Sequence, residues 1–223
     1  MRLFSFYQRS TMVDEILLRT DDILATARLG LDDMLSTDRT RRMSGLRNLI
    51  VFGRSVTFTL QNLSSKAEGF DEWYSAEQEV MKADSLMKYF LNLRNEILKQ
   101  GKLNVSTSAH ISSFNTEDIR KFPRPRNAVA FFIGDQIGGS GWEVELPDGS
   151  KEKYYVTLPS SIATVKQTFA DMPREKFPEL DGRSVEDLSS EYLEKLSALV
   201  SRARIRFGTN VRPSGRPHLT LVK

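Results

Sequence analysis

The sequence of 223 residues is long enough for one or two domains with a substantial core. Its hydrophobic fraction of 39% and charged fraction of 27% are ordinary for a soluble globular protein, and the net charge of +3 singles out no class of partner. The sequence has no cysteine, which excludes disulfides, thiolate metal sites and cysteine nucleophiles. His110 and His218 share no metal-ligand spacing, so we expect neither a zinc site nor a cofactor.

Nothing in the sequence indicates export or a membrane span. Residues 1–9 lack the long apolar core and small-residue cleavage site of a secretion signal. No apolar run approaches the roughly 20 residues that cross a bilayer. We therefore expect a cytoplasmic protein without a membrane partner.

The first half of the chain has the pattern of consecutive helices. Apolar residues recur at helical spacing over 11–35, and Asp38 then offers the chemistry of a helix N-cap. The segment 40–64 is apolar almost all round, which is typical of a helix at the centre of a bundle.

Two further helices follow. We expect the third at about 71–82, and a fourth that Asp84 or Ser85 caps and that Gly101 ends. Four helices with short connections favour an antiparallel bundle.

After Gly101 the pattern changes to short strands. We expect strands at 103–108, 128–133, 142–146 and 153–158. The last two flank Pro147-Asp148-Gly149-Ser150, whose composition predicts the tight turn of a hairpin. The segment 162–172 is expected to be helical, and 185–207 is a clear amphipathic helix that Gly208 ends.

Arg94 stands where a charge is not expected. When the fourth helix is wound at about 100° per residue, Arg94 falls inside one apolar arc. The arc consists of Leu86, Met87, Phe90, Leu91, Leu93, Ile97 and Leu98. Because burying an unpaired charge costs more than one side chain gains by hydrophobic burial, this guanidinium needs a partner. The partner is either a carboxylate of the fold or a phosphate in a cleft.

The second helix repeats this feature. Arg47, Arg54 and Gln61 are seven residues apart and therefore lie within about 40° of one another on the helix. An ion pair inside the bundle, with Glu96, Asp84 or a carboxylate of the first helix, would satisfy such arginines without any function.

The segment Arg94-Asn95-Glu96-Ile97-Leu98-Lys99 resembles the motif of the HEPN superfamily, in which an arginine, often followed by asparagine, precedes a histidine by about five residues. The resemblance covers about residues 10–101. It implies a helical bundle that dimerises so that both motifs face one cleft, in a toxin–antitoxin, stress or phage-defence setting. Many members are metal-independent ribonucleases in which the RNA 2′-hydroxyl attacks the phosphate. The resemblance makes Arg94 the phosphate clamp and Asn95 its orienting neighbour.

Lys99 stands where the family has histidine. A histidine titrates near pH 6.5 and exchanges protons at neutrality, whereas a lysine near 10.4 stays protonated and is a poor base. Lys99 lies about 140° from Arg94 around the helix, so we expect it in solvent. His110 is the alternative base.

Basic residues are unevenly distributed. From residue 197 to the end the chain has no acidic residue, but it has Arg202, Arg204, Arg206, Arg212, Arg216 and Lys223. A second basic run covers 120–126. Such clusters are typical of polyanion-binding surfaces and equally of a solubilising tail and linker. We expect RNA contacts from Arg47, Arg54, Arg124, Arg126, Arg202 and Arg206.

Two other features are weaker. The Gly-rich segment 132–142 lacks the ending of a phosphate loop and precedes a strand, so a hairpin loop is the better interpretation. Trp142, Tyr154 and Tyr155 either offer a stacking face for bases or, as we favour, pack the sheet on the bundle.

We therefore predict an α+β chain: a HEPN-like antiparallel bundle at 1–101, a β-rich region with a small antiparallel sheet at 102–183, a C-terminal helix at 184–207 that packs on the bundle or the sheet, and a basic flexible tail at 208–223. The predicted function is RNA binding, with weak metal-independent endoribonuclease activity through Arg94, Asn95 and Lys99. The alternative is a non-catalytic homodimeric module whose arginines form structural ion pairs and whose β-rich region docks a protein. Small-molecule hydrolysis has no supporting residues.

Overall fold

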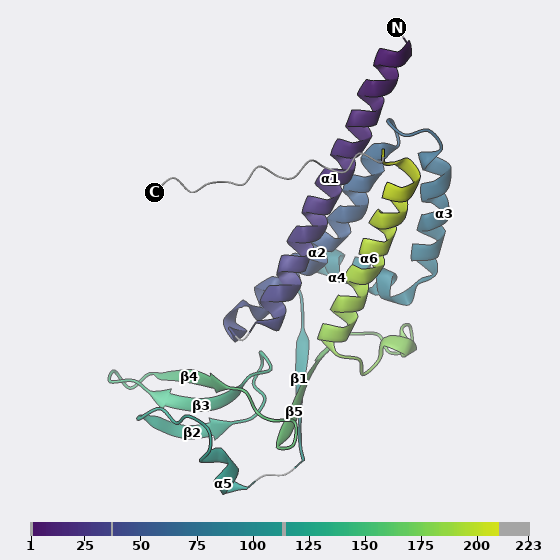
Figure 1. The fold of residues 1–223 in the computed structure, drawn as a ribbon. Helices are drawn as coiled ribbons and strands as arrows, with labels where there is room; N and C mark the ends of the chain where they lie inside the picture. Colours follow the sequence, from purple (N-terminus) through teal and green to yellow (C-terminus); the bar gives the residue numbers. More distant parts are fainter. Residues whose placement is uncertain (1, 37, 113–114, 210–223) are drawn as a thin grey trace, which may run out of the picture.

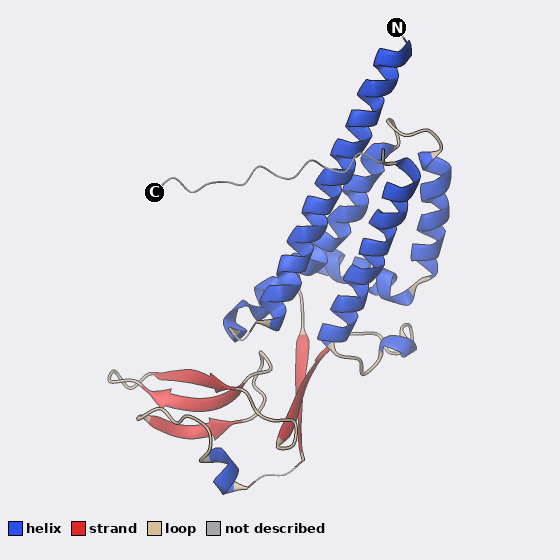
Figure 2. Cartoon of the chain, viewed as in Figure 1, coloured by secondary structure: helices blue, strands red, loops and turns tan. Residues whose placement is uncertain are grey.

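The computed structural model describes residues 2–36, 38–112 and 115–209. Its helices lie side by side in an elongated body, and the strands gather beyond one end of that body (Figure 1). The body consists of α1 (Arg2–Leu35), α2 (Arg42–Leu60), α3 (Phe70–Ala83), α4 (Ser85–Gln100) and α6 (Val185–Phe207). Figure 2 shows that the long helices and the strands occupy separate parts of the molecule, so the fold is α+β, as predicted.

The predicted helix boundaries follow from capping groups that the structure confirms. Asp38 accepts a hydrogen bond from the Thr40 amide at 3.1 Å, at the start of the short 3-10 helix η1 (Arg39–Arg41) that precedes α2. Asp84 accepts one from the Met87 amide at 3.0 Å and begins α4. Gly101 ends α4 with a φ of 66°, a conformation that glycine adopts without strain.

The helix α6 completes the bundle, although some eighty residues separate it from α4. It packs on α1, α2 and α4, and its Leu188 and Leu196 are fully buried in the same core as Leu49 and Phe90. The predicted C-terminal helix therefore exists, and it packs on the bundle. Of the predicted tail, only Gly208 and Thr209 lie within the described residues.

The helices α1 and α2 are in backbone contact. A Cβ atom at Gly30 would lie 2.6 Å from the carbonyl oxygen of Gly45, and one at Gly45 would lie as close to the carbonyl oxygen of Gly30. Only glycine allows this approach, which brings the C-terminal half of α1 against the start of α2.

The strands form two antiparallel sheets, where one was expected. In the first, β1 (Val105–Ile111) pairs with β5 (Ala163–Phe169), with Val105 opposite Phe169. In the second, β2 (Ala128–Phe132), β3 (Ser140–Glu145) and β4 (Lys151–Val156) pair in that order. The short helix α5 (Thr116–Ile119) lies between β1 and β2.

The predicted helix at 162–172 is wrong, because this segment is β5. Its inward positions alternate with period two: Ala163, Gln167 and Phe169 are buried and the residues between them are more exposed. That period fits a strand, and the β-branched residues of the segment favour one. Phe169 then anchors the ribbon in the helical core, with its ring 5.3 Å from that of Tyr89.

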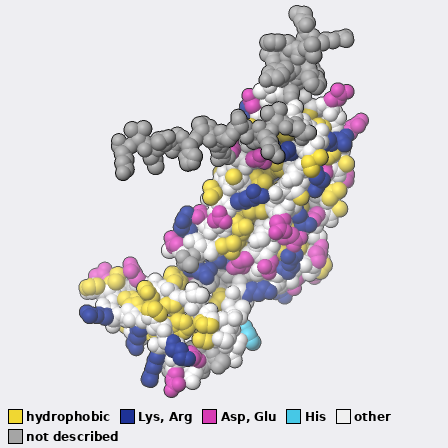
Figure 3. Space-filling view, viewed as in Figure 1, with side chains coloured by type: hydrophobic (Ala, Val, Ile, Leu, Met, Phe, Trp, Pro, Cys, Tyr) yellow, Lys and Arg dark blue, Asp and Glu magenta, His cyan; other side chains and the backbone are white. Residues whose placement is uncertain are grey.

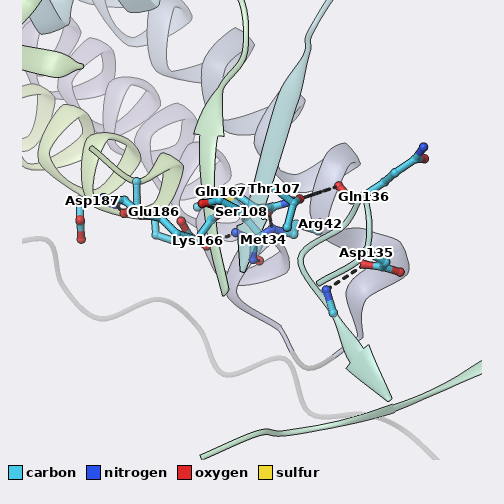
Figure 4. Close-up of polar contacts among 12 residues, drawn as sticks. Met34, Arg42, Thr107, Ser108, Asp135, Gln136, Lys166, Gln167, Glu186 and Asp187 are labelled. Atoms are coloured by element: carbon cyan, nitrogen blue, oxygen red, sulfur yellow. Dashed lines mark hydrogen bonds and ion pairs between the residues drawn. The ribbon is translucent and has the colours of Figure 1, made fainter. Parts of the chain in front are cut away.

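Arg42 joins the helical body to the sheets, as Figure 4 shows. Its side chain is 3% exposed. Nη1 donates to the Met34 carbonyl at 2.9 Å, Nε donates to Gln167 of β5, and Nη2 pairs with Glu186 in the first turn of α6. Gln167 in turn donates to the Gln136 carbonyl at 3.0 Å, in the loop between β2 and β3. One guanidinium thus fixes the ends of α1, α2, β5 and α6.

We expect Arg42→Ala to lower the free energy of unfolding by about 3 kcal/mol, because it leaves the buried Gln167 and the partly buried Glu186 without their partner. Urea denaturation measures this loss. The matched control is Arg41→Ala, which removes a surface ion pair with Asp33 and should cost at most about 1 kcal/mol. Equal losses in the two variants would contradict the role given to Arg42.

The Gly-rich segment is a hairpin loop, as predicted, and Asp135 organises it. Its carboxylate accepts hydrogen bonds from the amides of Ile137 and Gly139, at 3.1 and 2.9 Å. It also accepts from Lys153 Nζ at 2.8 Å and from the Tyr155 hydroxyl at 2.9 Å. Burial alone would raise the pKa of Asp135, but the hydrogen bonds from Lys153 and Gly139 outweigh it and lower that pKa.

Because the pKa of Asp135 is lower in the folded than in the unfolded protein, the free energy of unfolding depends on pH. Asp135 stabilises the fold above its unfolded pKa of about 3.9, and this contribution is lost as the pH falls through the lower folded value. Thermal unfolding between about pH 2 and 6 should therefore show a steep acid limb that Asp135→Asn flattens. If the melting temperature of Asp135→Asn falls with pH as steeply as that of wild type, other groups cause the loss of stability in acid.

Candidate functional site

Two helices bring the predicted arginines together around one aromatic ring. Arg54 and Phe58 are four residues apart on α2 and therefore share a face. Arg94 of α4 reaches the same ring: the guanidinium carbons of Arg54 and Arg94 lie 4.6 and 5.6 Å from its centroid. The ring itself is 47% exposed. We call Arg54, Phe58, Arg94 and Asn95 the arginine–phenylalanine site.

Arg94 is half-buried and has a neutral partner. Its Nη1 donates to Oδ1 of Asn95 at 3.1 Å, so the asparagine orients the guanidinium. Among the described side chains, no carboxylate lies within 4.0 Å of it. Asp84, one acid that we considered as a partner, is paired with Lys195 at 2.7 Å. The intramolecular ion pair is thus absent from the part of the chain that the structure describes.

Arg54 is also without a carboxylate within the described residues. Its Nη1 donates to Thr57 Oγ1 at 2.7 Å, whereas its Nε is buried and no acceptor of these residues reaches it. The next residue of the predicted stripe, Gln61, donates to the Thr57 carbonyl and to the Tyr74 hydroxyl, at 3.0 and 3.1 Å. Arg47, two turns before Arg54, is exposed and outside this network.

A cavity of about 150 Å³ opens beside Arg54, between α2, α3, α4 and α6. It is lined by Arg54, Thr57, Tyr74, Gln78, Met81, Lys82, Met87, Lys88, Leu91 and Tyr192. Tyr74 and Tyr192 are buried, and this burial raises the pKa of both phenols, which the positive charge of Arg54 opposes. Both therefore remain neutral at physiological pH.

The sequence does not reveal that Tyr192 belongs to this site. Gly53 is the local signal for it, because a Cβ atom there would lie 2.5 Å from Cε1 of Tyr192. The absence of a side chain next to Arg54 makes room for a ring that comes from α6. Which ring fills that space is settled only by the packing of α6.

The structure places the remaining predicted residues elsewhere. Lys99 is exposed in the last turn of α4, as expected. His110 is the last residue but one of β1, whose opposite end, at Val105, packs on the helical core. It is therefore remote from Arg94. His218 lies outside the described residues.

The two predicted arginines of the 120–126 run lie near the three-stranded sheet. Arg124 stacks over Trp142, at 5.1 Å from the ring centroid, and donates to the Ala128 carbonyl at 3.0 Å. Arg126 is exposed beside the start of β2. Since this sheet lies beyond the end of the helical body in Figure 1, neither arginine joins the arginine–phenylalanine site.

Three aromatic residues of the three-stranded sheet, Trp142, Tyr154 and Tyr155, do not share one face. Trp142 is 6% exposed and packs on Phe131 of β2, with ring centroids 4.8 Å apart, rather than on the bundle. Tyr154 pairs opposite Trp142 and is 46% exposed, whereas the next residue, Tyr155, lies on the other face. A joint stacking face of these three rings is therefore excluded.

The basic C-terminal helix is neutralised by acids from other helices. Arg202 donates through Nε and Nη2 to Glu77 of α3, at 2.8 and 2.6 Å, and this hydrogen bonding raises the pKa of Arg202. Arg204 pairs with Asp21 of α1. Arg206 is exposed and lies over the ring of Phe207. The apparent excess of positive charge is therefore smaller in space than along the sequence, and Arg212, Arg216 and Lys223 lie outside the described residues.

Figure 3 shows basic and acidic side chains intermingled over the visible face of the helical body, without a large single-sign patch. Among the described residues, no helix combines the length and apolar character that crossing a membrane requires. The arginine–phenylalanine site is the best-defined candidate for a polyanion contact among the described residues.

Comparison with known proteins gives one similarity. Residues 40–121, which include α2, α3, α4 and β1, match the model of the family described as Bacteriophage lambda protein ea47. The match covers less than half of the chain, and it contains every residue of the arginine–phenylalanine site. No curated protein and no solved structure matches the chain.

Replacing Arg54 tests whether its charge serves the fold. We expect Arg54→Met to change the free energy of unfolding by less than about 1 kcal/mol, because a half-buried guanidinium without a counter-charge contributes little beyond its packing. Urea denaturation measures the change. A loss above about 2 kcal/mol would show that Arg54 is a structural residue.

Proposed function

We propose that this protein binds RNA through the arginine–phenylalanine site. The observation that carries the proposal is the state of Arg94: a half-buried guanidinium, oriented by Asn95 and without a carboxylate among the described residues, beside an exposed ring. A guanidinium recognises a phosphate through two parallel hydrogen bonds, and Phe58 offers a face on which one base can stack. The resemblance to HEPN proteins supports the same assignment.

Slow metal-independent cleavage is the second part of the proposal. The RNA 2′-hydroxyl would attack the adjacent phosphorus and lose its proton to water, and the 5′-oxygen would leave and take a proton from water, while Arg94 stabilises the charge on the phosphate. Lys99, exposed in the last turn of α4, would contribute only to the positive potential around the site. Because no histidine of the described residues lies near Arg94, turnover should be low. The match to a family named after a bacteriophage protein supports a phage-related setting for this activity.

Arg94→Gln should weaken binding to labelled single-stranded RNA about tenfold and reduce the slope of log K against log salt by about 0.7. The matched control is Arg19→Gln, which removes the same charge from an exposed ion pair with Glu15 on α1. Equal affinities of wild type and Arg94→Gln would overturn the proposal. In the presence of a chelator, products ending in cyclic phosphate should form with wild type and not with Arg94→Gln.

A specific observation favours a second candidate, the homodimeric interaction module. Leu91 and Leu98 flank Arg94 along α4 and are 36% and 54% exposed, and Arg94 itself lies over the ring of the exposed Phe58. In this function a second copy covers the apolar side chains and pairs its acids with Arg94. Sedimentation of Arg94→Ala separates the two: loss of a dimer supports the module, whereas an unchanged oligomer with weakened RNA binding supports the first proposal.

A further inference from the structure

The cavity beside Arg54 has an unbalanced charge. Of its ten lining residues, Arg54, Lys82 and Lys88 are basic and none is acidic. Lys82 is paired with Glu79 at 2.7 Å, on the exposed surface. Neither of the other two cations forms an ion pair with a carboxylate of the described residues.

Two acids close in sequence to the cavity-lining residues are already engaged. Glu77, one turn before Met81 on α3, is bound by Arg202 through two hydrogen bonds. Asp84, between α3 and α4, is bound by Lys195. Rearranging either acid toward Arg54 would break an existing pair. Lys88 interacts electrostatically with Glu179, so the uncompensated charge of the cavity is that of Arg54.

The polar and apolar groups of the cavity are separated. Arg54 and Thr57 form one side, and the buried Nε of Arg54 has no acceptor among the described residues. The remaining walls are largely apolar or aromatic, formed by Met81, Met87 and Leu91 together with the tyrosine rings. A mostly apolar pocket with a few polar or charged donors is the usual form of a small-molecule site.

We propose that this cavity binds a small carboxylate that carries one ring. The carboxylate would accept hydrogen bonds from Arg54, and the ring would lie between the methionine side chains and Tyr192. The volume of about 150 Å³ is that of a cavity known to hold one benzene ring. Inorganic phosphate would satisfy Arg54 but leave the apolar walls without contact. The exposed Lys82 and Lys88 at the cavity would attract the anion.

Benzoate is the probe, and benzamide is its neutral counterpart of nearly the same shape. At ten times its midpoint concentration, benzoate should raise the melting temperature of the full chain by about 2–4 °C, in a saturable way. Benzamide and inorganic phosphate should produce no saturable rise. Equal effects of benzoate and benzamide would overturn the role of the charge, and an equal effect of phosphate would overturn the role of the ring.

Variants locate the binding site. Arg54→Gln and Leu91→Trp should each abolish the benzoate effect, the first by removing the donor and the second by filling the cavity from a partly exposed wall position. A cooperative melt of each variant without probe shows that it folds. A rise that persists in both variants would place benzoate elsewhere and refute the site.

This inference is independent of RNA binding, although Arg54 takes part in both. Arg94 does not line the cavity, so Arg94→Gln should retain the full benzoate effect. If Arg94→Gln binds both benzoate and RNA as well as wild type does, the proposed RNA-binding function is wrong but the cavity assignment stands. Loss of the benzoate effect in Arg94→Gln would defeat the cavity assignment alone.

Discussion

The buried guanidinium of Arg42 is the constraint on which the arrangement of this molecule depends. Its three nitrogens bind groups from α1, β5 and α6, and it is itself the first residue of α2. A planar group with fixed donor directions tolerates little displacement of its acceptors. The start of α6 is therefore held at the start of α2, and the rest of α6 must run along the bundle from that point. Tyr192 reaches Arg54 because of this direction.

Arginine has two opposite uses in this structure. Arg42 is almost fully buried, and its charge is matched by Glu186, so it holds elements together. Arg54 and Arg94 are half-buried and matched only by neutral groups of the described residues. Natural folds retain such uncompensated charges chiefly where function requires them, since selection for stability alone would remove them. The contrast is the main physical reason to place the functional site on α2 and α4.

Local patterns predicted much of the fold. The helices and their caps at Asp38, Asp84 and Gly101 followed from short-range rules, because the groups that satisfy each helix end lie within a few residues of it. The exposure of Lys99 followed from its angle on the helix. The strand β5 was not predicted from the sequence, because Phe169 of this short strand is buried against Tyr89 and Phe90, which lie far away in sequence.

Long-range pairing explains the other differences. The partner of Arg202 is Glu77, 125 residues earlier, and no spacing rule connects them. The sequence left open whether Arg94 has a carboxylate partner, because it places Arg94 among apolar residues but does not show which acids are already occupied. The packing of α3, α4 and α6 leaves it without one among the described residues. The division of the strands into two sheets likewise depends on β1 pairing with β5 across more than fifty residues.

The late position of α6 has a consequence for synthesis on the ribosome. The first four helices emerge long before α6, and until it arrives they lack one side of their core and the tyrosine that closes the cavity. A nascent or prematurely terminated chain therefore exposes an apolar flank and has an incomplete anion pocket. Only a polypeptide translated through α6 acquires the finished bundle and the closed cavity.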